Sequence, residues 1–184
     1  AGEVTVDTDE QPGKGKPDKI PTLRAAFAKD GTITAATSSS ISDGAAAVVL
    51  TRASLAAANG QTPVATVVAM AAHAQEPKDF TVAPVGAIQK VLDRAGWSVD
   101  DVDLWEVNEA FACVAMFAMR DIGIPHDRIN VNGGATALGH PIGASGTRII
   151  VTLLNALKSH GKKRGVASLC IGGGEATAIA VELA

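Results

Sequence analysis

The sequence of 184 residues is poor in cysteine, with only Cys113 and Cys170, and its longest apolar runs are short. Two cysteines far apart in sequence do not make a disulfide framework, so they favour a reducing compartment. The run at residues 45–50 is far below the roughly 18 residues that a membrane-spanning helix needs, and no charged-then-apolar leader is present. We therefore expect a cytoplasmic protein without a membrane span.

Basic residues are not concentrated anywhere in the chain. Lys and Arg number 16 against 19 Asp and Glu, which leaves a formal net charge of -3. Recognition of nucleic acid needs a basic patch, so we expect no nucleic-acid partner. The apolar content of 47% is enough for one sizeable core.

The first part of the chain has little to contribute to that core. Residues 8–21 are mainly Asp, Gly, Lys and Pro, a composition that predicts an exposed loop. A hydroxyl-rich stretch then leads to Asp43 and Gly44. We expect residues 1–42 to form a loop region and a connecting arm, and residues 43–184 to form one domain.

Beyond that boundary, strand-like segments alternate with helix-like ones. Continuous apolar runs predict strands at residues 45–51, 64–73, 104–107, 129–131, 166–171 and 176–183. Helical spacing and terminal glycines predict helices at residues 53–59, 84–95, 110–122 and 145–160. Such alternation implies crossover connections, so we expect an α/β fold whose mostly parallel sheet ends in an antiparallel hairpin.

A glycine-rich run from Asn130 to Gly146 joins a predicted strand to a predicted helix. Glycines there let the backbone approach a ligand closely, and free amides at a helix N-terminus stabilise an anion or a developing oxyanion. A phosphate-binding loop is the alternative, but the run contains neither a GxGxxG nor a GxxxxGK[ST] element.

Three polar side chains lie at what we call corners, the places where a predicted strand ends or a predicted helix begins. His140 lies inside the glycine-rich run, Cys170 precedes three glycines at the end of a predicted strand, and Asn108 follows another. Strand ends of α/β sheets are where ligands bind, and bare glycine amides make oxyanion donors. Each residue also has a structural alternative: a lone histidine, an interior cysteine or a helix N-cap. The remaining histidines match no common metal-site spacing, so we expect no metal.

Together these corners resemble the thiolases, the acetyl-CoA acetyltransferase and 3-ketoacyl-CoA thiolase family. NEAF at residues 108–111, NVNGGATALGHPIGASG at 130–146 and CIGGG at 170–174 follow one another in the family's order. The resemblance covers the chain from about Leu23 to its end. It implies a thiolase-like layered fold with one βαβαβαββ half, and an acyl-CoA C-acyltransferase that cleaves 3-ketoacyl-CoA by thiolysis or forms it by Claisen condensation.

The resemblance also implies roles for individual residues. His140 activates the nucleophilic thiol and, with a water positioned by Asn108, holds the thioester oxygen, while Cys170 is the acid/base at the α-carbon. The Gly172 amide contributes to a second oxyanion hole. Residues expected to contact the CoA thioester substrate or line its tunnel are Ser39, Leu23, Phe27 and Phe111. A thiol with a pKa near 8.5 needs positive surroundings or donors to act as a base, which glycine amides and a neighbouring histidine could supply.

The family further implies CoA thioesters as substrates, no cofactor, a place in fatty acid metabolism, and a homodimer or homotetramer. Its nucleophilic cysteine belongs to an N-terminal domain, and Cys113 sits in mid-helix as a poor candidate. We therefore expect an N-terminal thiolase half to supply the nucleophile, and the 184-residue chain to be inactive alone. The sequence departs from the family pattern at Thr37, Ser40, Ser42 and 80–83, which puts substrate preference in doubt.

Two other functions stay open on the sequence. A ketoacyl synthase shares the fold but uses two histidines, or histidine with asparagine, where this chain offers His140 and Cys170. A non-catalytic acyl-CoA- or lipid-binding relative would need no acid/base pair.

Overall fold

The computed structural model describes residues 2–184, which divide into two compact units at residues 36 and 37. The first unit contains α1 (Glu10–Lys14) and a 3-10 helix (Pro17–Thr22), and none of its described residues is buried. Every residue from 8 to 21 is exposed, because the segment has almost no apolar side chain to bury. The domain boundary expected near residue 42 stays a prediction.

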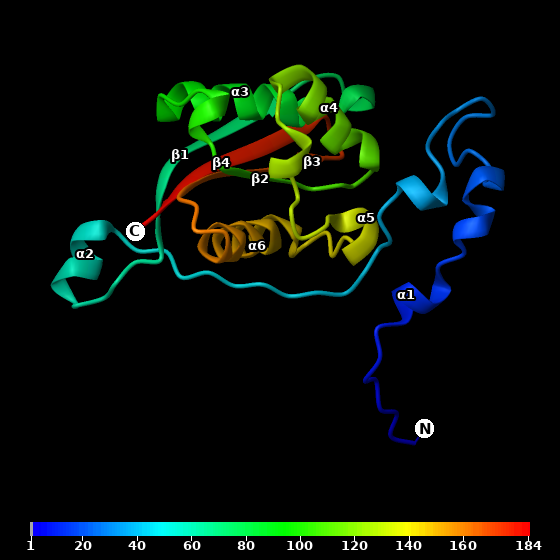
Figure 1. Cartoon of the computed structure of the whole chain (residues 1–184), viewed down its shortest axis with the longest axis horizontal. Coiled ribbons are helices and arrows are strands. Elements are labelled where there is room, and N and C mark those ends of the chain that lie inside the picture. The colour runs from blue at the N-terminus through cyan, green and yellow to red at the C-terminus, as the bar shows by residue number, and fades with distance from the viewer. Residues whose placement is uncertain (1) are drawn as a thin grey trace. The chain divides into compact units, whose positions relative to one another are not determined.

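The second unit is built on one four-stranded sheet (Figure 1). Its strands are β1 (Ala65–Ala74), β2 (Leu104–Val107), β3 (Arg164–Ile171) and β4 (Glu175–Leu183), in the order β1-β4-β3-β2. β2 pairs with β3 in parallel, whereas β4 is antiparallel to both β1 and β3. All four residues of β2 are buried, although β2 is the last strand in the order of the sheet.

Helices cover both faces of the sheet. α3 (Ala83–Ala95) and α4 (Ala112–Ile122) lie on one face, and α6 (Ser145–Ser159) lies on the other (Figure 1). Each face has its own buried cluster, one centred on Trp105 and Ile88 and the other on Ile149 and Leu153. The remaining helical segments are α2 (Ala53–Ala58), α5 (Ala135–Leu138) and the 3-10 turns Ala35–Thr37, Pro77–Asp79, Val99–Asp101 and His126–Arg128.

The α/β class and the terminal hairpin are confirmed, but the expectation of a mostly parallel sheet is wrong. The tight turn after β3 forces β4 to run back antiparallel, and β1 pairs with β4 rather than with another crossover strand. The expected strand at 129–131 is only a single bridge from Ile129 to Trp105. It stops there because Asn130 has a φ of 49°, which no extended strand continues.

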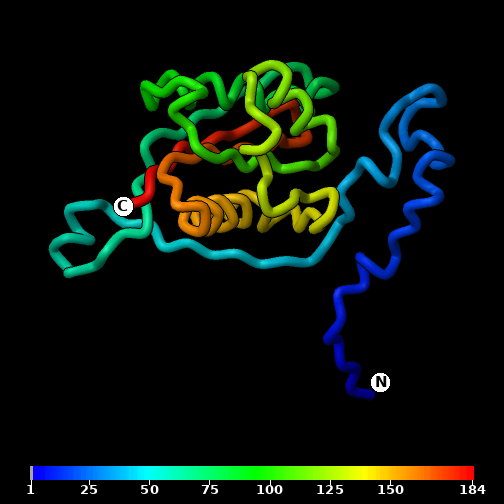
Figure 2. Tube along the Cα trace, viewed as in Figure 1, coloured from blue at the N-terminus to red at the C-terminus, as the bar shows by residue number. Residues whose placement is uncertain are grey.

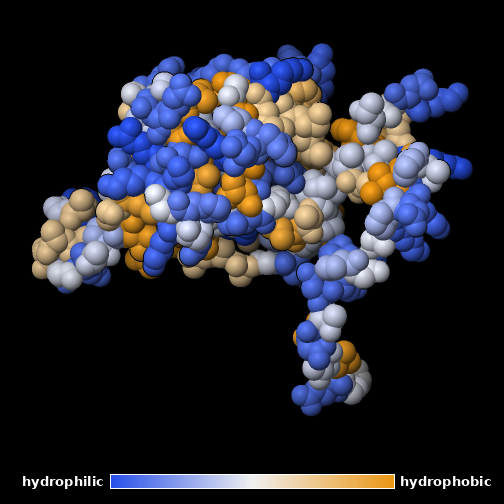
Figure 3. All heavy atoms as spheres, in the orientation of Figure 1, coloured by the Kyte–Doolittle hydropathy of each residue, from blue (hydrophilic) through white to orange (hydrophobic). Residues whose placement is uncertain are grey.

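The apolar run at 45–51 also fails to enter the sheet. Figure 2 shows this stretch as an extended trace that leads into α2 outside the four strands. Val49 is 96% exposed and Leu50 is 76% exposed. Apolar atoms accordingly lie at the surface beside α2 in Figure 3. Hydrophobicity alone predicted a buried strand, but burial requires a partner surface that this unit does not offer to the segment.

In the part of the chain that the structure describes, no helix is both long enough and apolar enough to cross a bilayer.

The core on the α6 face should respond strongly to truncation. Leu153 is fully buried and packs against Gly165 on β3, so Leu153→Ala should lower the free energy of unfolding by about 2–5 kcal/mol. Leu55→Ala on α2 is the control, because Leu55 is 47% exposed and should cost under about 1 kcal/mol. Denaturant unfolding of the chain measures both values, and equal losses would contradict this account of the core.

Candidate active site

The parallel pairing of β2 with β3 brings two of the three corners to one edge of the sheet. Val107 is in register with Ser168, and the Asn108 N–H donates to the Ser168 carbonyl at 3.0 Å. Cys170 lies two residues further along β3, and Gly172 follows where the strand ends. Asn108 and Cys170 therefore share this edge of the sheet because both parallel strands end there.

Asn130 and Glu109 attach the glycine-rich run to the same edge. The Asn130 side-chain amide accepts from the Val107 N–H at 2.8 Å and donates to the Val107 carbonyl at 2.9 Å. It also donates to Glu109 Oε1 at 2.8 Å, while Glu109 Oε2 accepts the Thr136 N–H at 3.2 Å. A Cβ on Gly134 would collide with this carboxylate. This close approach explains why residue 134 is glycine.

His140 is held on three sides. Its backbone N–H donates to the Ser40 carbonyl at 2.8 Å. In its ring, Nε2 lies 3.3 Å from Asn108 Nδ2 and Nδ1 lies 2.6 Å from Ser145 Oγ. The preceding Gly139 has a φ of 90°, and a Cβ there would run into the Ser42 hydroxyl. The ring is therefore fixed at the corner that Asn108 occupies.

Burial lowers the pKa of the His140 imidazole, and the positive charge of Arg148 lowers it further. The half-buried ring is therefore neutral near pH 7 and carries a lone pair on one nitrogen. A neutral imidazole with one lone pair can accept a proton from a thiol, which is the chemistry that a general base needs.

Behind Asn108 lies a buried ion pair that the sequence analysis missed. Arg148 Nη2 donates to Asn108 Oδ1 at 3.3 Å, and Arg148 Nη1 lies 3.6 Å from Glu106 Oε2. Glu106 is only 1% exposed. Burial raises its pKa to about 7, with Glu109 adding to the rise and Arg148 opposing it. A glutamate inside a four-residue strand that is otherwise apolar was the available signal.

Cys170 is buried at the end of β3, and burial raises the pKa of its thiol to about 11. A backbone hydrogen bond opposes this rise, and the second thiol, Cys113 on α4, adds to it. Desolvation is the largest of these influences, so the thiol is protonated at neutral pH. The expectation that a neighbouring histidine and glycine amides favour the thiolate stays a prediction.

The remaining expected site residues lie in different places. Gly172 is exposed in the turn between β3 and β4, and its N–H makes no hydrogen bond within residues 2–184. Ser39 donates through its N–H and its hydroxyl to the Ala110 carbonyl. Phe111 packs edge-to-face against Phe80 at 6.1 Å between ring centroids. Leu23 and Phe27 belong to the first unit, so their role stays a prediction.

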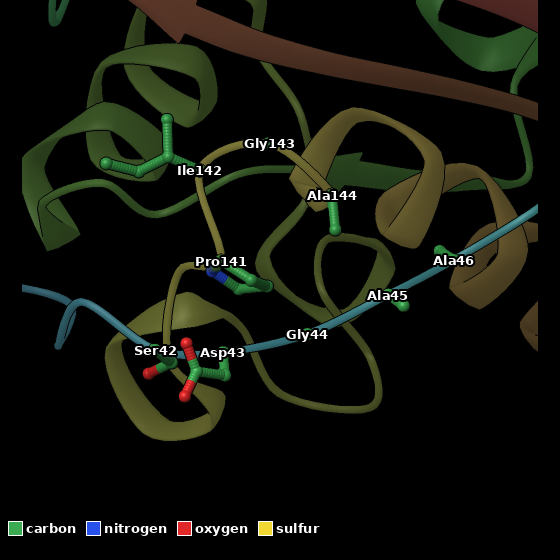
Figure 4. A pocket seen from close by; sticks show the side chains of 9 residues that line it. All are labelled: Ser42, Asp43, Gly44, Ala45, Ala46, Pro141, Ile142, Gly143 and Ala144. Carbon is green, nitrogen blue, oxygen red and sulfur yellow. The ribbon is translucent and has the colours of Figure 1, made fainter.

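An open pocket of about 360 Å³ adjoins His140. Residues 42–46 form one wall, and Pro141 to Ala144 form the other. In Figure 4 Pro141 faces the extended 42–46 segment, while Ile142 points away from it. Among residues 2–184 no three His, Cys, Asp or Glu side chains converge in a way that could hold a metal ion.

The raised pKa of Glu106 makes stability depend on pH. A carboxyl that binds its proton more tightly in the folded state stabilises the fold below pH 4.5 and loses this contribution as pH rises through about 7. The loss should reach about 3 kcal/mol, at about 1.4 kcal/mol per pKa unit. Glu106→Gln should remove it, whereas Glu175→Gln at the exposed start of β4 should not. Denaturant unfolding at pH 4.5 and pH 8 tests this, and an unchanged pH dependence in Glu106→Gln would rule it out.

The raised pKa of Cys170 predicts slow alkylation at neutral pH. In a Cys113→Ala chain, the rate of reaction with iodoacetamide should rise with pH toward a midpoint of about 11. The matched Cys170→Ala chain reports the half-buried Cys113 for comparison. A midpoint for Cys170 at or below that of an ordinary thiol, about 8.5, would show that desolvation does not dominate.

Comparisons with known proteins agree with the motifs. The family described as "Thiolase, C-terminal domain" matches residues 61–183, and "Thiolase, N-terminal domain" matches residues 1–54. The acetyl-CoA acetyltransferase of Chromobacterium violaceum is 50% identical over 90% of this chain and 42% of its own length. That of Syntrophomonas wolfei is 45% identical over 98% of this chain and 46% of its own length. The chain thus spans about half the length of the curated relatives it matches.

Solved structures give the same result at the level of the fold. The acetyl-CoA acetyltransferase of Bacillus anthracis superimposes with a TM-score of 0.88 at 40% identity, over 91% of this chain and 42% of that one. Human mitochondrial 3-ketoacyl-CoA thiolase in complex with CoA gives 0.85 at 37% identity, over 93% of this chain and 43% of that one. The thiolase C-terminal domain family matches two thirds of the residues, and the solved thiolases share the fold. This chain therefore belongs to the thiolase family.

Proposed function

We propose that this chain carries the acid/base and oxyanion half of an acyl-CoA C-acyltransferase, a thiolase that reversibly cleaves 3-ketoacyl-CoA or condenses acetyl-CoA. The observation that carries the proposal is the neutral His140, held against Asn108 on the sheet edge where Cys170 and Gly172 also lie. Similarity to enzymes named acetyl-CoA acetyltransferase supports it. A ketoacyl synthase or a purely binding relative is not favoured.

The proposed thiolysis has two half-reactions. A nucleophilic thiol gives its proton to His140 and attacks the 3-keto carbon of the substrate, after which the C2–C3 bond breaks and an acyl-enzyme remains. The carbanion left on C2 takes a proton from the Cys170 thiol, and acetyl-CoA leaves. The thiol of a second CoA then gives its proton to the Cys170 thiolate and attacks the acyl-enzyme. The nucleophile leaves as a thiol with the proton held by His140, and the shortened acyl-CoA departs. Condensation is the reverse sequence.

The pKa values of this chain suit those proton transfers. His140 is neutral at rest and can accept a proton, while the buried Cys170 thiol is protonated and can donate one. The Gly172 N–H, which has no partner within residues 2–184, is free to donate to the oxyanion that forms on the 3-keto oxygen when the thiol attacks C3. His140 and a water held by Asn108 would stabilise the thioester oxygen, on which the enolate charge forms as the C2–C3 bond breaks, as the family resemblance implies.

The nucleophile must come from polypeptide other than these 184 residues under this proposal. Cys170 is committed to the α-carbon, and Cys113 lies within α4, where burial raises the pKa of its thiol. An N-terminal thiolase half is the partner we propose. The exposed apolar segment at 45–50 supports it, because that segment has surface to bury against further protein.

Coenzyme A thioesters are the proposed substrates, with no resident cofactor. The pocket between residues 42–46 and 141–144 adjoins His140 and Ser39 precedes it, so we place the pantetheine arm there. Two solved relatives contain CoA. Fatty acid metabolism, a cytoplasmic location and a homodimer or homotetramer complete the proposal, supported by the family resemblance and by the reduced cysteines.

Cys170→Ser separates the two half-reactions. In a complete enzyme made from this chain and an N-terminal thiolase half, thiolysis of acetoacetyl-CoA should fall by roughly 10²- to 10⁴-fold, because the proton donor at C2 is lost. Transfer of an acetyl group from acetyl-CoA to the nucleophile should survive. Cys113→Ser is the matched control and should keep thiolysis.

Steady-state assays and mass spectrometry of the acyl-enzyme measure the two activities. Unchanged thiolysis in Cys170→Ser would refute the assignment. Rapid thiolysis by the 184-residue chain alone would refute the requirement for a second polypeptide.

A further inference from the structure

We propose that Arg148, held by Glu106, is a positioning residue that fixes the tautomer of His140 through the Asn108 amide, so that the imidazole always presents the Nε2 lone pair. The inference about the tautomer stands on hydrogen-bond geometry. Its consequence for catalysis rests on the proposed thiolase function.

The Arg148 guanidinium has hydrogen-bond donors and no acceptor. Arg148 Nη2 lies 3.3 Å from Asn108 Oδ1, so the amide oxygen must face the guanidinium. A flipped amide would set two donors against each other in a place where Asn108 is only 1% exposed. The amide NH₂ is thereby directed at His140 Nε2, 3.3 Å away, and Nε2 has to accept.

The other end of the network leads to the same conclusion independently. The Ser145 hydroxyl donates to the Pro141 carbonyl at 3.0 Å, and a carbonyl can only accept. Because its single hydrogen is used in that bond, the hydroxyl accepts from His140 Nδ1, which lies 2.6 Å away. A hydrogen therefore sits on Nδ1. The donor-only arginine requires the Nδ1–H tautomer, and the acceptor-only carbonyl favours it as long as the Ser145 hydroxyl keeps its bond to Pro141.

Glu106 keeps the arginine in this position. Arg148 Nη1 lies 3.6 Å from Glu106 Oε2, and the glutamate side chain is 2% exposed against 19% for the arginine. Opposite charges attract strongly where water is excluded, so the guanidinium is held against the strand that ends at Asn108. Ser145 is fully buried as well, so bulk water does not compete for its hydroxyl at the far end.

The fixed tautomer has a direct use in the proposed reaction. In this tautomer the Nε2 lone pair accepts from the Asn108 NH₂ at 3.3 Å. The incoming thiol gives its proton to this lone pair in place of the Asn108 N–H, and His140 becomes an Nε2–H donor for the thioester oxygen. One nitrogen then serves both as base and as oxyanion donor, in that order. The opposite tautomer would have no base at this position.

Nitrogen-15 NMR of the 184-residue chain at pH 8 tests the tautomer without any turnover. Two-bond proton–nitrogen correlations should show a pyrrole-type Nδ1 and a pyridine-type Nε2 for His140, assigned by the loss of both signals in His140→Gln. Arg148→Met should move both nitrogens toward averaged shifts, because the amide is then free to flip while the Ser145 hydroxyl turns its hydrogen from the Pro141 carbonyl to Nδ1. Arg148→Lys, which retains a donor, should restore most of the difference.

Arg120→Met is the matched control, since the Arg120 side chain is 66% exposed on α4 and far in sequence from the network. It should leave the His140 shifts unchanged. A wild-type chain with an Nε2–H signal overturns the proposal. So does an unmixed tautomer in an Arg148→Met chain whose other signals show an intact fold. If Arg148→Met does not fold, the wild-type and Arg148→Lys spectra still decide.

Kinetics of the complete enzyme give a second test of the positioning role of Arg148. Arg148→Met should lower kcat roughly 10- to 100-fold with little change in KM, as expected when a reacting group is misplaced. A purely structural arginine would leave the nitrogen shifts unchanged, and this outcome would overturn the positioning role. A fixed tautomer together with an enzyme unable to cleave acetoacetyl-CoA would instead refute the proposed function and leave the tautomer in place.

Discussion

The paired hydrogen bonds between the Asn130 side chain and the Val107 backbone are the constraint on which the candidate site depends. They end the strand-like run after Ile129, turn the chain through a positive φ, and anchor the glycine-rich loop at the end of β2. Since β2 runs parallel to β3, the same anchor places the loop at the edge where Cys170 lies. Two local bonds thereby bring together residues from three distant segments.

Desolvation sets the resting charge state of the site. It lowers the pKa of His140 and raises those of Cys170 and Glu106, so all three groups are pushed toward their neutral forms. Charge then appears at His140 only when a proton moves there. In a region of low dielectric constant, fixed donors such as the Gly172 amide act most strongly on charge created in the reaction. Before substrate binds, His140 and Cys170 are therefore neutral, while Arg148 supplies a positive charge behind Asn108.

The motifs were predictable from sequence because local backbone chemistry determines them: glycines where a Cβ would collide, and polar residues after apolar strands. The direction of the strands was not, because it depends on which segments pair, and β1 pairs with β4 more than a hundred residues away. The prediction of a buried strand at residues 45–51 was wrong for the same reason. Arg148 was missed although Ser145 and Arg148, three residues apart, share one face of α6.

Assembly and chemistry draw on separate parts of this chain. The acid/base network is complete within residues 37–184, since every bond from Glu106 to Pro141 forms inside that unit. The surface left for further polypeptide is instead apolar, with Val48, Val49 and Leu50 exposed. Burying such side chains stabilises a complex by about 1.5–3 kcal/mol each. Changes in that segment would therefore weaken the proposed assembly without disturbing His140, because the acid/base network forms from residues 37–184 alone.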